Sequence, residues 1–422
     1  MTQSLDVFLW GMKVGTLASS KKGYSQQICF YFDPDFVKYG LDISPLRASI
    51  KGIAAQNLLP IYPENDKIFG GLPSFIADSL PDHWGNVIFS EWAKKHHLRF
   101  KKISALDRLA YIGRRGMGAL EFVPPTSDEM ETPFRVEIDE LSRLSQMALK
   151  DAQNFHASMS PDFMIESLFK VGTSAGGRRP KAVVNVNLST GECFSGQVPT
   201  PIPGFVPMIV KFDEHSDVPT TSIEYSYYLM AVDAGLKMMP SYQLKGASET
   251  HFMTQRFDRS GNEKIHIQTL AAINPLSDSY EDLFDAALKL KVKPEEIKQL
   301  FLQMAMNVYG GNIDDHNKNF SFIMSRDGGW HVAPAYDFTF TVDPSAPYYL
   351  NRHSMTINGK NEDIGREDLM EVARKFDIKC AGTLISKALD VTARYSRYAE
   401  QASVPAHWIS HITSELARRS TL

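Results

Sequence analysis

Residues 294–320, with the sequence PEEIKQLFLQMAMNVYGGNIDDHNKNF, contain the pattern on which the fold depends. The first part predicts a helix over residues 294–309, because proline suits the first helical position and Glu295 and Glu296 suit the positive end of the helix dipole. Apolar residues recur at the spacing of one helical face: Ile297, Leu300, Phe301, Met304, Ala305 and Val308. We therefore expect a helix buried on one side that leads directly into a pair of glycines.

The composition of the whole chain narrows the class of protein. Of its 422 residues, 43% are hydrophobic and 22% are charged, which is enough apolar sequence to bury a core and excludes disorder or a small disulfide-linked scaffold. A formal net charge of −4 argues against general nucleic-acid binding. The cysteines are scattered without a CxxC pair, and neither a signal peptide nor a long apolar run is present. We expect a globular protein of the cytoplasm.

The densest group of polar residues follows the predicted helix. Asp314 and Asn319 are separated by four residues, which is the D-x-x-x-x-N spacing of the kinase catalytic loop. In that chemistry the aspartate orients the substrate hydroxyl and accepts its proton, while the asparagine oxygen is a suitable ligand for Mg²⁺. Further along the chain, Asp337 precedes a phenylalanine as in the DFG element, although Thr339 replaces the glycine. Together the three residues predict phosphoryl transfer.

The neighbours of Asp314 are expected to have lesser roles. We interpret Asp315 as a carboxylate of the turn and His316 as a residue that organises the loop. Lys318 is a candidate for neutralising the γ-phosphate of a nucleotide, an interpretation that stays open.

A glycine-rich turn over residues 171–181 runs into a strand. Gly176 and Gly177 allow backbone N–H groups to approach a phosphate, and Ser174 and Lys181 add further donors. The segment matches neither GxxxxGK[ST] nor GxGxxG, so an ordinary hairpin turn explains it equally well.

A candidate phosphate-pairing lysine, Lys211, ends the apolar strand that follows. Glu224, on the next predicted helix, is a candidate partner for this lysine, with a solvated helix carboxylate equally open. Residues 252–259, FMTQRFDR, predict a strand and a connector suited to contacting an adenine through backbone groups.

These segments, in this order, resemble the signatures of HipA-type serine/threonine kinases, the toxin half of bacterial HipBA toxin–antitoxin modules. The resemblance lies in SAGGRRPK at 174–181, RFDR at 256–259, DDHNKNF at 314–320, PAYD at 334–337 and MTINGK at 355–360. It implies an α+β fold of the bilobal protein-kinase-like (HipA-like) type with a small N-terminal α/β subdomain.

The resemblance also implies a division of the chain. The N-terminal subdomain would cover residues 1–125, followed by a linker and helix at 126–160. The kinase N-lobe with its glycine-rich loop would cover 161–258, and the helical C-lobe with the catalytic loop 259–422. A Pro-Pro-Thr-Ser sequence at 124–127 is typical of a linker and agrees with the first boundary.

By position in the family pattern, Asp314 would be the catalytic residue, while Asn319 and Asp337 would hold Mg²⁺. Lys211 would pair with the nucleotide phosphates. Ser174 would be autophosphorylated, although Thr173 is not excluded as the acceptor. A phosphate of charge near −2 in the glycine-rich loop would repel the phosphates of ATP and expel the loop.

The resemblance further implies that Gln255 and Phe257 line the adenine site, and that Asp258 is a weaker candidate for contacting the ribose. Two departures from the family pattern occur here. The family often has a glutamate where this chain has Gln255, and an acidic residue in the segment after Arg259, where residues 266–270 contain none.

The implied activity is ATP- and Mg²⁺-dependent phosphorylation of Ser or Thr on a translation-related protein, with an aminoacyl-tRNA synthetase as the target type. A HipB-like helix-turn-helix antitoxin is the implied partner, DNA is reached only through that antitoxin, and no membrane is involved. Two alternatives stay open. A small-molecule phosphotransferase would use the same Asp–Asn–Asp chemistry, and a catalytically inactive chain would act as a corepressor with a DNA-binding antitoxin.

Overall fold

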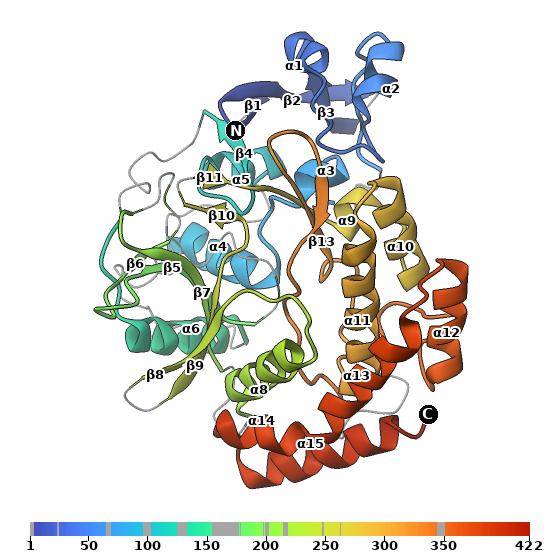
Figure 1. Cartoon of the computed structure of the whole chain (residues 1–422). Helices are drawn as coiled ribbons and strands as arrows, with labels where there is room; N and C mark the ends of the chain where they lie inside the picture. Colours follow the sequence, from blue (N-terminus) through green and yellow to red (C-terminus); the bar gives the residue numbers. More distant parts are fainter. Residues whose placement is uncertain are drawn as a thin grey trace. The chain divides into compact units, whose positions relative to one another are not determined.

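The computed structural model describes residues 4–22, 25–64, 69–95, 103–124, 133–153, 177, 179–196, 198, 202–213, 218–246, 249–261, 263–343 and 351–422. The chain forms two compact units. Unit 1 consists of Met1–Val218, Leu244–Ile267 and Arg326–Gly328, and unit 2 of Pro219–Gln243, Gln268–Ser325 and Gly329–Leu422. Figure 1 shows the elements of both units, each of which is described separately below.

Unit 1 begins with an antiparallel sheet of strand order β3-β2-β1-β4. Its strands are β1 (Ser4–Leu9), β2 (Met12–Lys22), β3 (Ser25–Phe32) and β4 (Leu120–Val123). Alternate residues of β1 are buried, as expected for a strand with one face on a core. Gly11, at φ +81°, makes the tight turn between β1 and β2.

Between β3 and β4, the residues that the structure describes form the helices α1 (Pro34–Tyr39), α2 (Ile50–Ala55), α3 (Ser74–Ala77), α4 (His83–Lys95) and α5 (Ala105–Ile112). The chain leaves the helical conformation between α3 and α4, where Pro81 cannot continue a helical hydrogen-bond ladder. The Ser104 hydroxyl accepts a hydrogen bond from the Asp107 backbone N–H and fixes the start of α5.

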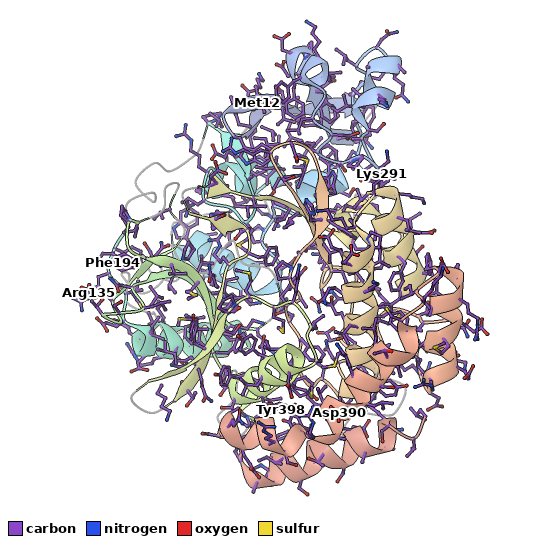
Figure 2. All side chains as sticks on the ribbon, viewed as in Figure 1. Met12, Arg135, Phe194, Lys291, Asp390 and Tyr398 are labelled. Atoms are coloured by element: carbon purple, nitrogen blue, oxygen red, sulfur yellow. The ribbon has the colours of Figure 1, made fainter. Side chains whose placement is uncertain are left out.

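A second sheet, four of whose five strands lie in unit 1, has the strand order β6-β5-β7-β9-β8. Its strands are β5 (Lys181–Val186), β6 (Cys193–Ser195), β7 (Val206–Lys211), β8 (Ser241–Lys245) and β9 (Thr250–Gln255), with α6 (Ile138–Gln153) before them in the chain. One apolar core joins α4 and α6 to this sheet through side chains such as Trp84, Leu141 and Val184. Arg135 and Phe194, labelled in Figure 2, form a β-bridge beside β6.

Unit 2 is mainly helical. It contains α8 (Thr220–Asp233), α9 (Leu270–Ile273), α10 (Tyr280–Lys289), α11 (Pro294–Gly310), α12 (Arg366–Lys375), α13 (Ala381–Ala393), α14 (Tyr395–Gln401) and α15 (Ala406–Arg419). The helix predicted over residues 294–309 is confirmed as α11, with Pro294 in its first turn. It packs against α10, α13 and α15, which explains why its second half is buried on all sides rather than on one face.

Short strands follow Asp258. Strands β10 (Arg259–Ser260) and β11 (Glu263–Lys264) form a hairpin, and β12 (His266–Thr269) joins β13 (Ser321–Met324) and β14 (Trp330–Val332) in a three-stranded sheet. Each of these strands is two to four residues long, too short for a detectable period-2 pattern. In the described part of the chain, no helix is long and apolar enough to cross a membrane.

Candidate active site

The candidate catalytic loop starts where α11 ends. Gly311 adopts the left-handed conformation, φ +64°, that stops the helix. Two buried carbonyls at the end of the helix accept hydrogen bonds from side chains distant in sequence. The Tyr227 hydroxyl donates to the Gly310 carbonyl (2.6 Å), and the Arg419 guanidinium donates to that of Val308 (3.2 Å). The point from which the loop departs is therefore fixed by α8 and α15.

The backbone of Asp314 is held from two sides. The Thr341 hydroxyl oxygen accepts hydrogen bonds from the backbone N–H groups of Ile313 (2.8 Å) and Asp314 (3.1 Å). On the other side, the Asn319 amide nitrogen donates to the Asp314 carbonyl (2.7 Å). The Asp314 side chain itself is 65% exposed, so its carboxylate can meet a substrate from solution.

The same hydrogen bond orients the side chain of Asn319. Because the amide nitrogen is bound to the Asp314 carbonyl, the amide oxygen faces the other way. An oxygen of this kind is a suitable ligand for Mg²⁺. The D-x-x-x-x-N spacing thus has a structural basis, since it lets the asparagine fix the aspartate and still offer a ligand oxygen.

Asp337 lies between two anchored aromatic residues. The hydroxyl of Tyr336 donates to the Lys318 carbonyl of the catalytic loop (2.7 Å), and Phe338 is buried edge-on against Tyr227 with ring centroids 5.2 Å apart. Asp337 has φ +51°, an uncommon backbone conformation that aspartate tolerates better than most residues and that clusters at functional sites. These contacts bring the segment of Asp337 to the loop that holds Asp314 and Asn319.

Asp315 is not the turn carboxylate that the sequence suggests; that interpretation was wrong. Its side chain is completely buried. It accepts hydrogen bonds from the Tyr280 hydroxyl (2.7 Å), the His353 Nδ1 (2.7 Å) and the Ser354 backbone N–H (2.8 Å). Burial, followed by the charge of Asp315, raises the pKa of Tyr280 well above its usual range, so Tyr280 remains a donor. Sequence reasoning missed this anchor because its partners lie far away in the chain.

The expected role of His316 agrees with its contacts. Its Nδ1 accepts a hydrogen bond from the Lys318 backbone N–H (3.3 Å), and its carbonyl accepts one from the Asn319 backbone N–H (2.9 Å). Lys318 lies within this turn, and a contact of its amine with a γ-phosphate stays a prediction.

The candidate phosphate-binding lysines lie side by side in unit 1. Lys181 on β5 and Lys211 on β7 are direct partners in the antiparallel ladder, so their side chains share one face of the sheet. Both are buried, at 4% and 7% exposure, and the Lys211 amine lies 5.7 Å from the centre of the Phe252 ring. Glu224 is buried on α8 in unit 2, and its pairing with Lys211 stays a prediction.

The glycine-rich turn is described only in part, since Ser174 and Gly176 lie outside the described residues. Gly177 has φ +103°. Its N–H donates to the Asp82 carboxylate (3.1 Å), and its carbonyl accepts from the Trp84 backbone N–H (3.2 Å). The expected contact of the Gly177 N–H with a phosphate would therefore have to displace Asp82.

Gln255 and Phe257 are the residues expected at the adenine site. Gln255 is the last residue of β9, Phe257 lies two positions later, and both side chains are partly buried. Asp258 is completely buried and bound to Arg256 at 2.8 and 2.7 Å, to Arg259 at 2.7 Å and to the Gly118 N–H at 2.8 Å.

Burial alone would raise the pKa of Asp258, but the charges of Arg256 and Arg259 outweigh it and hold the pKa well below its usual range. A contact between Asp258 and a ribose would break this cluster. We therefore assign Asp258 to the scaffold that joins β9 to the Gly116–Gly118 turn.

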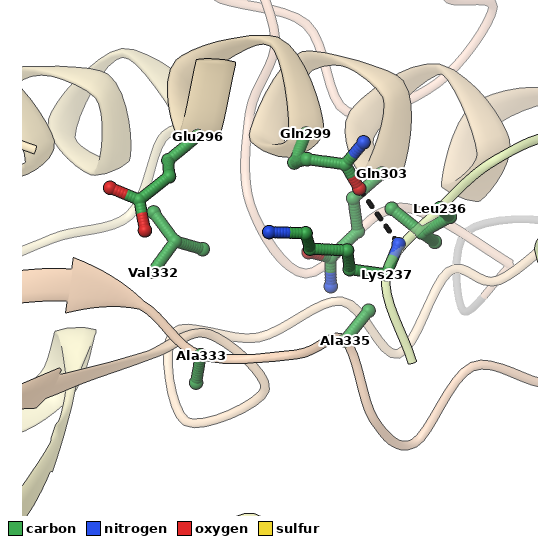
Figure 3. A pocket seen from close by; sticks show the side chains of 8 residues that line it. All are labelled: Leu236, Lys237, Glu296, Gln299, Gln303, Val332, Ala333 and Ala335. Atoms are coloured by element: carbon green, nitrogen blue, oxygen red, sulfur yellow. Dashed lines mark hydrogen bonds between the residues drawn. The ribbon is translucent and has the colours of Figure 1, made fainter. Parts of the chain in front are cut away.

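A small pocket in unit 2 lies beside the segment that leads to Asp337 (Figure 3). Its volume of about 20 Å³ is room for one water molecule, far less than a nucleotide needs. Gln299 accepts a hydrogen bond from the Lys237 backbone N–H (2.7 Å), and the Lys237 carbonyl accepts one from the Ala335 N–H (2.8 Å). The pocket wall thus helps to fix Ala335, two residues before Asp337.

The described residues contain no cluster of three or more His, Cys, Asp or Glu side chains placed to hold a metal ion. Mg²⁺ is usually held by one or two protein ligands together with substrate phosphates and water. The carboxylate of Asp337 and the amide oxygen of Asn319 are ligands of the required chemistry.

Comparisons with known proteins identify the class of fold and then the family. The model of the HipA N-terminal domain matches residues 5–123, and the model of the HipA-like C-terminal domain matches residues 173–412. The fold is therefore the two-domain HipA fold, and the α+β, HipA-like prediction is confirmed. The chain belongs to the HipA family.

The structure is similar to a chain of the toxin–antitoxin complex of HipA, HipB and operator DNA from Shewanella oneidensis MR-1. The two share 17% sequence identity with a TM-score of 0.63, over 99% of this chain and 96% of that chain. The proinflammatory kinase CtkA of Helicobacter pylori matches with 13% identity over 52% of this chain and 88% of its own, at a TM-score of 0.35, which is too low to support an argument. No curated protein sequence gave a significant match.

Proposed function

We propose that the protein is a HipA-like serine/threonine-protein kinase toxin that transfers the γ-phosphate of ATP to a translation-related protein, with an aminoacyl-tRNA synthetase as the target type. One observation carries the proposal. The exposed carboxylate of Asp314, the amide of Asn319 and the segment of Asp337 belong to one hydrogen-bonded assembly, joined by the Asn319–Asp314 and Tyr336–Lys318 bonds. This is the set of groups that phosphoryl transfer requires.

In this mechanism Asp314 accepts the proton of the substrate hydroxyl. The hydroxyl oxygen forms a bond to the γ-phosphorus while the bond from that phosphorus to the β-phosphate oxygen breaks, leaving ADP. Mg²⁺, when bound, neutralises charge on the β- and γ-phosphates. Asn319 and Asp337 supply its protein ligands, and Lys318 stabilises the transferred phosphate.

The paired lysines of unit 1 support nucleotide binding in this proposal. Lys181 and Lys211 provide positive charge for the ATP phosphates, and Gln255 and Phe257 line the adenine site. Ser174 of the glycine-rich loop is the proposed site of an inhibitory autophosphorylation, because a phosphate there would repel bound ATP.

A HipB-like antitoxin is the proposed partner, supported by the similarity to a chain that was solved together with HipB and operator DNA. In this proposal the protein acts in the cytoplasm and contacts DNA only through the antitoxin. The two alternatives are a small-molecule phosphotransferase and a non-catalytic corepressor. The second is disfavoured, because Asp314, Asn319, Asp337 and Lys211 are all present.

Labelling of a bacterial extract distinguishes these functions. The purified protein is incubated with γ-³²P-ATP, Mg²⁺ and the extract, with EDTA added to a parallel sample. A protein kinase places the label in a discrete protein band, and EDTA abolishes it. Label confined to small molecules would favour the alternative phosphotransferase, and the absence of any transfer would favour the corepressor.

The autoinhibition proposal has a separate test. Ser174→Ala should lose label on the protein itself but prolong transfer to the extract protein. If Ser174→Ala still took up one phosphate per molecule, the autoinhibition proposal would fall and the kinase proposal would stand.

A further inference from the structure

The residue after the proposed catalytic aspartate is a buried carboxylate with three hydrogen-bond donors in two other segments of the chain. Asp315 Oδ2 accepts from Tyr280 at the start of α10 and from His353, and Oδ1 accepts from the Ser354 backbone N–H. All three contacts are 2.7–2.8 Å long, as expected for hydrogen bonds to a charged acceptor. Asp315 thus fastens the loop to residues 353–354, far beyond it in sequence.

The hydrogen-bonded chain continues behind Tyr280. The Asn307 amide donates to the Tyr280 hydroxyl (2.8 Å), and the Asn312 amide donates to the Asn307 side-chain oxygen (3.0 Å). Tyr280, Asn307, Asn312 and Asp315 are all at most 3% exposed. The network therefore starts and ends in the loop itself, at Asn312 and Asp315, and encloses Asp314 between two buried anchors.

The same network defines the hydrogen-bonding role of each ring nitrogen of His353. Its Nδ1 must donate, because the carboxylate of Asp315 can only accept. Within the described residues its Nε2 is buried without a hydrogen-bond partner, which is less costly for an acceptor lone pair than for an N–H group. His353 accordingly acts as a hydrogen-bond donor to Asp315 through Nδ1. The backbone also joins the two segments, since the Ser354 N–H donates to the Ile313 carbonyl (3.0 Å).

We propose that Asp315, held by Tyr280, His353 and Ser354, is the positioning residue that aims Asp314 at the substrate hydroxyl, so that residues 353–354 form part of the catalytic apparatus. This inference rests on the proposed kinase function. Asp314 can be both exposed and precisely placed, because its neighbour bears the hydrogen bonds that fix the loop.

The test replaces Asp315 by asparagine, which keeps the shape of the side chain but turns one acceptor oxygen into a donor. Whichever way the amide is oriented, its NH₂ group opposes at least one of the three donors around it. Asp368→Asn is the matched control. Asp368 is 6% exposed and accepts from Asn358, Lys360 and the Gly365 N–H, none of which belongs to the loop.

Two measurements are made on full-length protein. In hydrogen exchange followed by mass spectrometry, Asp315→Asn should exchange the amides of residues 312–319 about tenfold faster, whereas Asp368→Asn should leave them unchanged. In phosphate transfer from γ-³²P-ATP, Asp315→Asn should lower the maximal rate about a hundredfold with little change in the KM for ATP. Asp368→Asn should keep the rate of the wild type.

Variants of His353 add a rescue test. Asparagine places a donor nitrogen at the same position along the side chain as Nδ1, whereas leucine removes the donor. His353→Asn should retain most of the rate that His353→Leu loses. Equal losses in Asp315→Asn and Asp368→Asn, or unchanged loop exchange in Asp315→Asn, would overturn the inference. If the wild type transfers no phosphate, the kinase proposal fails, while the exchange experiment still decides whether Asp315 holds the loop.

Discussion

Asp314 and Asp315 are chemically identical neighbours that the fold places in opposite environments. The side chain of Asp314 is 65% exposed, while that of Asp315 is completely buried and bound by three donors. An exposed carboxylate can exchange a proton with a substrate, whereas a buried one with satisfied hydrogen bonds serves as an anchor. The division of roles follows from their partners and not from the residue type.

Protonation of the buried His266 should lower the free energy of unfolding of unit 1 in mild acid. His266 donates through Nε2 to the Ile43 carbonyl (3.1 Å), and burial lowers its pKa to about 4 although that hydrogen bond opposes the shift. The unfolded chain, with a histidine pKa near 6.5, therefore binds more protons between pH 6.5 and 4. Stability conferred by neutral His266 is fully present above about pH 6.5 and is lost as the pH falls, by about 3 kcal/mol across this window.

Urea unfolding of the wild type at pH 7 and pH 4.5 measures this loss. His266→Gln keeps a donor nitrogen but cannot titrate, so its free energy of unfolding should change much less between the two values. The exposed His407→Gln variant serves as the control and should behave like the wild type. Equal pH dependence in wild type and His266→Gln would refute the assignment.

At the scale of residues, the sequence predicted what depends on local spacing. The Asp314–Asn319 pair could be found because the hydrogen bond between them spans only five positions. The anchoring of Asp315 could not, because its partners Tyr280 and His353 lie 35 and 38 positions away. The burial of Asp258 could not be predicted from the sequence either, because one of its hydrogen-bond donors is Gly118, 140 positions earlier.

Helix α11 is the element that links packing to the site. Its last carbonyls lack partners within the helix, as at any helix C-terminus. Arg419 of α15 supplies a charged donor to the Val308 carbonyl and is held in turn by Glu415 (2.9 Å). A cation at this end of a helix is also favoured by the helix dipole. Elsewhere in unit 2, Arg394, which lies between α13 and α14, donates to Asp233 of α8 (3.0 Å), 161 positions away, and to Asp390 of α13 (2.6 Å), which Figure 2 labels.

Arg419→Leu should lower the free energy of unfolding of unit 2 by about 2–3 kcal/mol, because it leaves buried acceptors without their donor. Arg418→Leu is the matched control. Arg418 bonds to the same Glu415 but its side chain is 55% exposed, so its loss should cost at most about 0.5 kcal/mol. Chemical denaturation of both variants gives the comparison. Similar losses in the two would show that Arg419 does not support α11.

At the scale of elements, α11 could be predicted from the sequence because it begins with a proline, has acidic residues in its first turn and ends at a glycine. The strands β10, β11 and β12 could not be predicted, because such short strands are determined by the strands they pair with and not by a periodic pattern of their own. The same holds for the aromatic contacts that anchor Phe338, which depend on Tyr227 from a distant helix.

For the molecule as a whole, both HipA family models match, and each unit carries part of the residues that the kinase proposal needs. Lys181 and Lys211 belong to unit 1, and Asp314, Asn319 and Asp337 to unit 2. Composition alone indicated a globular chain of small net charge, and it contained no indication of catalysis. The expectation of phosphoryl transfer came from a few residues and their spacing, and the structure adds the contacts that hold them.

The most direct test of the kinase proposal is the rate of phosphate transfer from γ-³²P-ATP to protein by Asp314→Asn. This variant keeps the shape of the side chain and removes the proton acceptor. We predict a loss of about a thousandfold, equivalent to about 4 kcal/mol of transition-state stabilisation. Asp285→Asn, which changes an exposed carboxylate of α10, should retain the rate of the wild type. Transfer by Asp314→Asn at the wild-type rate would contradict the assignment of Asp314 as the catalytic residue.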